Sequence, residues 1–145
     1  MSVVLDIADA VVAELASSPD GTFGQPFTPV RRVLPQFELS ELKDLQVSVV
    51  PHAVENSLAA RGLALKEVQI DIGIQKRLGK DLDAEIVPLL TLVEQIDAYL
   101  RQRPLQAVQG APWLKSTNDP IYASDHLAND RVFTSVLTVS YRVMV

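Results

Sequence analysis

Apolar residues alternate strictly with polar or small residues over 67–75, and this pattern constrains the fold more than any other in the sequence. Val68, Ile70, Ile72 and Ile74 are separated by residues that are polar or small. Successive side chains of a β-strand point to opposite faces of a sheet, so a period of two indicates a strand. The segment is therefore predicted to be a strand with one face in the core. Its other face is expected to meet water or a partner.

Two segments have the three- and four-residue spacing of apolar residues that is typical of amphipathic helices. They are Val3–Leu15 and about 83–101. Asp81, Asp83 and Glu85 lie at the start of the second helix, where the helix dipole favours negative charge. We interpret these carboxylates as helix-start charges, because the stretch lacks the glycine and the later glutamate of a calcium loop.

The remaining segments are read from β-branched residues and prolines. Extended chain is predicted over 28–34 as an outer strand, over 46–50 as a strand that stops at Pro51, over 112–117, and over 131–145. Residues 38–45 are expected to form one or two helical turns, and 124–130 a loop or a helical turn. Residues 52–65 show no clean period, so they are interpreted as a long connection, which in a compact domain is usually functional or mobile.

The order of these elements predicts the fold class. A chain of 145 residues is the usual size of one domain, so residues 1–145 are expected to form a single domain. Helices and strands joined by short or irregular links favour an α+β fold. Its sheet is predicted to be antiparallel or mixed, with four to five strands and two main α-helices packed on it.

Composition excludes several classes of protein. The chain has no cysteine, which removes disulfides, thiolate metal ligands and a cysteine nucleophile. Its formal net charge of −5 disfavours tight binding of nucleic acid, which needs clustered Lys and Arg. No apolar stretch is long enough to span a bilayer, and the start of the chain lacks the basic segment of a secretory signal. We therefore expect an unprocessed protein that needs no membrane.

Candidate catalytic groups are sparse. The only histidines, His52 and His126, lie in no metal-binding spacing and are interpreted as surface residues. Neither a phosphate-binding loop nor a nucleophile elbow is present. We therefore predict no catalytic, cofactor-binding or metal-binding residue, no cofactor, and no enzymatic activity.

Two apolar segments instead point to subunit contact. The strand over 131–145 carries apolar residues on both faces in places, which fits either burial inside the monomer or partial packing against a neighbouring subunit. The connection over 52–65 is apolar for a solvated loop, and guanidinium groups such as that of Arg61 are common at subunit contacts. The predicted interface residues are Leu58, Arg61, Leu63, Val143, Met144 and Val145.

Taken in order, four segments give the chain a resemblance to a known family. They are the helix Val3–Leu15, the strand 47–51, the run 69–76 before an amphipathic helix, and the closing segment 133–143. Together they cover most of the chain, and in size and order they resemble the tail-terminator (tail-completion) proteins of long-tailed bacteriophages.

The resemblance implies a virion structural protein made in the cytoplasm of a bacterial host and located at the head–tail junction. Such subunits form a homo-oligomeric ring, commonly of six copies, that caps the tail tube protein, stops tube polymerisation and offers an attachment surface to head–tail connector proteins. DNA passes through the ring without specific binding, which suits an acidic protein. Alternatives are another head-completion or connector protein, a small non-viral oligomeric binding module, and an enzyme with an unrecognised site.

Overall fold

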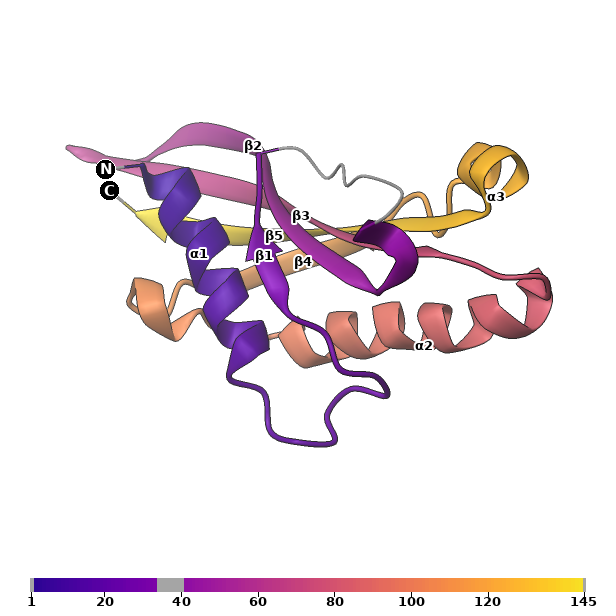
Figure 1. The fold of residues 1–145 in the computed structure, drawn as a ribbon. Coiled ribbons are helices and arrows are strands. Elements are labelled where there is room, and N and C mark those ends of the chain that lie inside the picture. The colour runs from indigo at the N-terminus through magenta and orange to yellow at the C-terminus, as the bar shows by residue number, and fades with distance from the viewer. Residues whose placement is uncertain (1, 34–40, 145) are drawn as a thin grey trace.

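The computed structural model describes residues 2–33 and 41–144, and it has the α+β fold that the sequence predicts. One five-stranded sheet carries two long helices, α1 and α2 (Figure 1). In chain order the helices and strands are α1 (Val3–Ala16), β1 (Pro29–Arg31), β2 (Gln46–Ala60), β3 (Leu63–Arg77), α2 (Leu82–Leu100), β4 (Trp113–Asn118), α3 (Ser124–Asp130) and β5 (Val132–Met144). Two short 3₁₀ helices, η1 (Glu41–Lys43) and η2 (Gln106–Val108), lie in the connections.

The sheet is mixed, with the strand order β1-β2-β3-β5-β4. Only the pair β1–β2 is parallel, and the other three pairs are antiparallel. β3 is the central strand, and Ile72 lies opposite Val49 of β2 and Leu137 of β5. The alternation over 67–75 therefore belongs to the strand that has two long neighbours.

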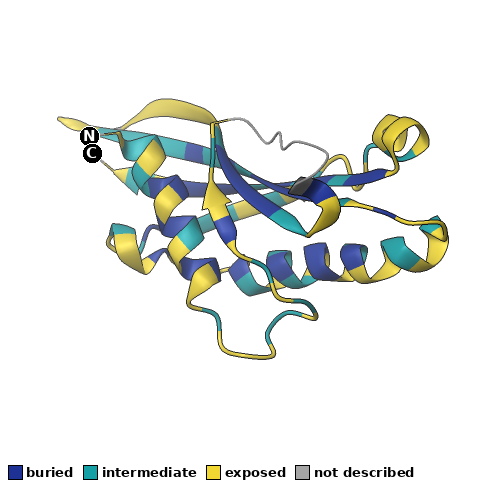
Figure 2. Cartoon of the chain, in the orientation of Figure 1, coloured by how far each residue is buried: buried dark blue, intermediate teal, exposed yellow. Residues whose placement is uncertain are grey.

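The core lies between the helices and one face of this sheet. Ile70, Ile72 and Ile74 are fully buried together with side chains from both long helices and from β5 (Figure 2). The helical contributors are Ile7, Ala8, Ala10, Val11, Leu15, Leu89, Leu92, Val93, Ile96 and Leu100. The closing strand contributes Phe133, Leu137, Val139 and Tyr141 to this core.

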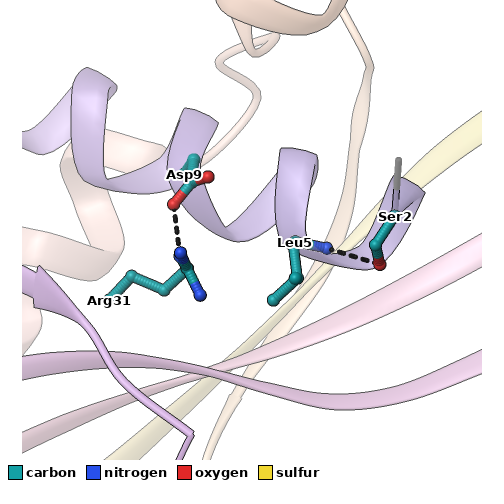
Figure 3. A network of polar contacts seen from close by, with 4 residues as sticks. All are labelled: Ser2, Leu5, Asp9 and Arg31. Atoms are coloured by element: carbon teal, nitrogen blue, oxygen red, sulfur yellow. Dashed lines mark hydrogen bonds and ion pairs between the residues drawn. The ribbon is translucent and has the colours of Figure 1, made fainter.

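Polar contacts hold the start and the middle of α1. The Ser2 hydroxyl accepts a hydrogen bond from the backbone N–H of Leu5, which caps the start of α1 (Figure 3). One turn further along, the Asp9 carboxylate pairs with the Arg31 guanidinium of β1 (Figure 3). This ion pair links α1 to the edge strand that it covers.

Two of the three carboxylates clustered at the start of α2 accept hydrogen bonds from backbone N–H groups there. The Asp81 carboxylate accepts a hydrogen bond of 3.2 Å from the backbone N–H of Ala84, so Asp81 is the N-cap. Glu85 reaches back and accepts from the backbone N–H of Gly79 at 2.9 Å. The interpretation of these residues as helix-start charges is confirmed for Asp81 and Glu85.

The prediction of a long connection over 52–65 is wrong. β2 runs without interruption to Ala60, and only Arg61 and Gly62 separate it from β3. Pro51 does not end the strand for two reasons: it lies beyond the part of β2 that pairs with β1, and the register with β3 shifts between Pro51 and Ala53. Edges and bulges are the positions where a strand tolerates proline. The two strands form one long hairpin.

The shorter elements follow the sequence more closely. Of the outer strand predicted over 28–34, residues 29–31 form β1 at the sheet edge, and residue 34 lies outside the described range; the strand predicted over 112–117 is β4. Residues 124–130 form a helix, α3, rather than a loop. Of the helical turns predicted over 38–45, the described part is η1, where Leu42 is buried; residues 38–40 lie outside the described range.

Tyr141 is the most deeply buried titratable group of the sheet. Its side chain is fully buried, and its hydroxyl has no hydrogen-bond partner among the described residues. Burial raises the pKa of Tyr141 well above its ordinary value of about 10, and the negative charge of Glu14 raises it further. The folded protein therefore keeps this phenol protonated at pH values at which the unfolded chain loses the proton.

We expect this group to make the protein sensitive to alkali. Above pH 10 the unfolded state binds fewer protons than the folded state, so the free energy of unfolding should fall by about 1.4 kcal/mol per pH unit. In Tyr141→Phe this contribution should be absent, while stability at pH 7 stays within about 1 kcal/mol because an unpaired hydroxyl is removed. Urea unfolding at pH 7 and pH 11 measures both effects, with Tyr122→Phe as the exposed control. Equal alkaline losses in wild type and Tyr141→Phe would contradict this.

Candidate subunit interface

The β2–β3 hairpin extends beyond the body of the domain as an arm, which we define as residues 52–66. Every arm residue with a described side chain is exposed or only partly buried (Figure 2). The first fully buried position after the turn is Val68. The arm therefore has no core of its own.

The arm protrudes because its neighbours in the sheet are short. β1 pairs with only three residues of β2, Val47 to Val49. On the other side β4 pairs with β5 no further than Tyr141, so only the end of β5 accompanies the arm. Among the described residues, no strand pairs with the outer edge of β2 beyond Val49, and such an edge is a template for pairing with another chain.

The structure brings five of the six predicted interface residues to this one end of the sheet. Leu58 and Leu63 flank the turn that contains Arg61. Val143 and Met144 lie opposite Lys66 and Leu65 of β3, at the base of the arm tip, which we define as residues 58–65. Val145 lies outside the described residues. Segments separated by about 80 residues in the sequence thus lie at the same end of the sheet, with Val143 and Met144 on its opposite faces.

Three of the side chains at this end of the sheet are apolar and exposed. Leu58 is 81% exposed, Met144 62% and Leu63 43%, whereas Val143 is partly buried against the core. Leu58, Leu63 and Ala64 line a shallow hollow of about 480 Å³ together with Asn56, Ser57 and Gly62. Clustered exposed apolar side chains are typical of surfaces that bind another protein. For β5, burial inside the monomer holds as far as Tyr141, and the strand end remains accessible.

Some charged side chains on the arm and beside it have polar partners, and others have none among the described residues. The Lys66 ammonium donates to the Asn56 amide oxygen at 2.6 Å, and Glu67 pairs loosely with Lys115 of β4 at 3.8 Å. Arg61, in contrast, has no hydrogen bond or ion pair with any described residue. It is also the only charged residue between Leu58 and Leu65. The arm tip is thus an apolar surface with one free positive charge.

His52 lies at the base of the arm, on β2 rather than in a loop. Its Nδ1 is 2.9 Å from Oδ2 of Asp71, and the Thr138 hydroxyl donates to Oδ1 of the same carboxylate at 2.6 Å. Both oxygens of the Asp71 carboxylate are therefore in contact with side chains from the two strands that neighbour β3. His126 contacts the Thr134 hydroxyl through its Nδ1 at 2.9 Å. Within residues 2–33 and 41–144, no three His, Cys, Asp or Glu side chains are grouped as metal ligands, and no helix could span a membrane.

The sequence predicts three of the arm residues as interface residues, but it does not predict the hairpin that carries them. Gly62 is the signal that identifies the turn: its φ is +80°, a conformation that L-residues rarely adopt, and it follows directly on Arg61. Apolar runs of similar length lie on either side of this pair. Val54, 40% exposed on the arm, was not among the predicted interface residues.

Comparison with protein-family models gives no match, and comparison with curated proteins gives none either.

Proposed function

We propose that this chain is a tail terminator of a long-tailed phage, a structural protein that assembles into a ring at the head–tail junction. The ring, of about six copies in this family, caps the tail tube, stops its polymerisation and offers a surface to the connector proteins of the head. The role needs no reacting group and no cofactor. The protein is made in the cytoplasm of the bacterial host and resides in the virion.

The hairpin arm is the observation on which this proposal depends. A lone subunit gains little from a hairpin whose outer half packs on nothing, because isolated two-stranded hairpins are marginally stable. Packing against a second subunit would cover Leu58, Leu63 and Met144, and would give Arg61 a partner. The arm therefore supports a protein that completes its structure by assembly.

Two further features support the phage assignment over a general binding module. The four segments that resemble tail terminators include the central strand β3, the helix α1 and the closing strand β5. The net charge of −5 suits a channel that DNA must pass without adhering, since phosphates are repelled by an acidic protein.

The test is the assembly state of the purified chain, alone and mixed with the tail tube protein of the same phage. We expect an annulus with six-fold symmetry by negative-stain electron microscopy, or rings that appear only at the ends of tubes. Tubes grown in the presence of the chain should also be shorter than tubes grown without it. A chain that stays monomeric at every concentration, and that neither binds nor shortens tubes, would refute the proposal. Rings that bind head connectors but ignore tubes would instead identify a head-completion protein.

A further inference from the structure

A second exposed apolar surface lies in the connection from β4 to α3 and at the start of α3, and we define it as residues 119–125. Ile121 is 55% exposed and Tyr122 42% exposed. Two exposed carboxylates, Asp119 and Asp125, flank this pair. Neither carboxylate has an ion pair with any described residue. The surface is thus apolar at its centre and negative at its margins.

The backbone of this surface is held against β5. The N–H of Asp119 donates to the carbonyl of Val136 at 3.0 Å, and the N–H of Ala123 donates to the carbonyl of Thr134 at 2.9 Å. The Asn118 side chain adds a 2.8 Å hydrogen bond to the same Val136 carbonyl. Ile121 and Tyr122 therefore project from a fixed segment, which reduces the entropy that binding would cost.

The 119–125 surface and the arm tip lie at opposite ends of the molecule. β3 and β5 are paired from Leu65↔Met144, beside the arm tip, to Arg77↔Val132, beside α3. A separation of twelve residues along a strand corresponds to roughly 40 Å. Figure 1 shows the hairpin tip and α3 at the two ends of the sheet. The two surfaces of one chain therefore cannot meet, and any contact between them joins two chains.

Their chemistry is complementary. The arm tip offers a hollow between Leu58 and Leu63 and a free positive charge on Arg61. The 119–125 surface offers two protruding apolar side chains and free negative charges. Two arm tips facing each other would instead bring two Arg61 side chains together, which opposes a symmetric dimer through this surface. Contact between unlike surfaces is heterologous, and repetition of it yields a ring or an open chain.

We propose that the arm tip of one copy docks on the 119–125 surface of the next copy. Ile121 and Tyr122 pack into the hollow between Leu58 and Leu63, and Arg61 pairs with the carboxylates of Asp119 and Asp125. This inference rests on the proposed function, because it names the partner surface for the arm of a ring-forming subunit. It also assigns a direction to the ring, since each copy gives an arm on one side and receives one on the other.

Charge reversal tests the pairing. Arg61→Glu and the double variant Asp119→Arg/Asp125→Arg should each weaken self-association roughly tenfold or more, as measured by sedimentation velocity at a concentration at which wild type assembles. Reversals at two exposed residues outside both surfaces, Asp20→Arg and Lys43→Glu, serve as matched controls and should change nothing. If wild type assembles only on tubes, binding of each variant to tube ends replaces sedimentation.

Mixing the two defective variants gives the decisive result. In an alternating assembly, each reversed arm meets a reversed 119–125 surface and each unchanged arm meets an unchanged one. The mixture should therefore assemble with an affinity within about threefold of wild type. Assembly that is lost in Arg61→Glu, unaffected by Asp119→Arg/Asp125→Arg, and not rescued by mixing would overturn this pairing while leaving the ring proposal intact. A wild-type chain that assembles neither alone nor on tubes would overturn both.

Discussion

Replacing Leu58 and Leu63 together by aspartate is expected to abolish self-association while leaving the fold intact. Both side chains are exposed in the single chain, so their replacement should change the free energy of unfolding by less than about 1 kcal/mol. In an assembled ring the same carboxylates would be buried without partners beside apolar side chains. The association constant should therefore fall at least about 100-fold, which sedimentation velocity and negative-stain microscopy can measure.

An exposed apolar residue away from the arm provides the control for this variant. Val87 is 59% exposed on α2, and Val87→Asp should leave both assembly and tube capping unchanged if the arm is the contact. Circular dichroism and thermal unfolding of the double variant establish that it is folded. Normal rings from a folded Leu58→Asp/Leu63→Asp protein would show that the arm tip takes no part in assembly.

The architecture follows from the sequence because its main signals are local and strong. The alternation from Val68 to Ile74 and the apolar stripe of the helix over 83–101 each repeat over several periods, so one substitution does not obscure them. The helix boundaries were accurate to within one residue at both ends of α2 because Asp81 caps one end and Pro104 follows the other. These elements are therefore predictable without knowledge of how they pack together.

The hairpin was missed because its outer half lacks those signals. A strand that packs on a core alternates, but the described side chains of the arm do not belong to the core, and residues 52–65 show no period. Pro51 then appeared to end the strand, although a proline at an unpaired edge beside a bulge does not do so. The absence of a pattern in this segment reflects its exposure rather than an irregular loop.

The candidate interface is predictable from the sequence only in part. Leu58 and Leu63 are conspicuous because the segment 52–65 is apolar for a solvated connection, and Arg61 is conspicuous because it is a single charge among apolar and small residues. Their proximity to Met144 depends on the register Leu65↔Met144, which only the fold supplies. The exposure of Ile121 and Tyr122 likewise depends on the hydrogen bonds that hold their segment against β5. Sequence patterns identify such side chains, but the pairing of strands decides which of them share a surface.

Replacing Ile72 by alanine is expected to have the opposite effect to the arm variant: a large loss of stability with assembly retained. Ile72 is fully buried at the centre of the sheet, opposite Val49 and Leu137. Removing three buried carbon atoms leaves a cavity that neighbours in two strands fill only partly. The free energy of unfolding should fall by about 3 to 4 kcal/mol, and the melting temperature by roughly 10 °C.

Urea and thermal unfolding measure this loss, and Val87→Ala, an exposed truncation, should change stability by less than about 0.5 kcal/mol. Well below its melting temperature, Ile72→Ala should still assemble like wild type, because the side chain lies far inside the surface that contacts a neighbour. A cost below about 1 kcal/mol would mean that β3 is not the centre of a packed core. Lost assembly by a folded Ile72→Ala protein would mean that folding and association are not separable in this chain, and that the arm is positioned by the core as well as by its own strand pairing.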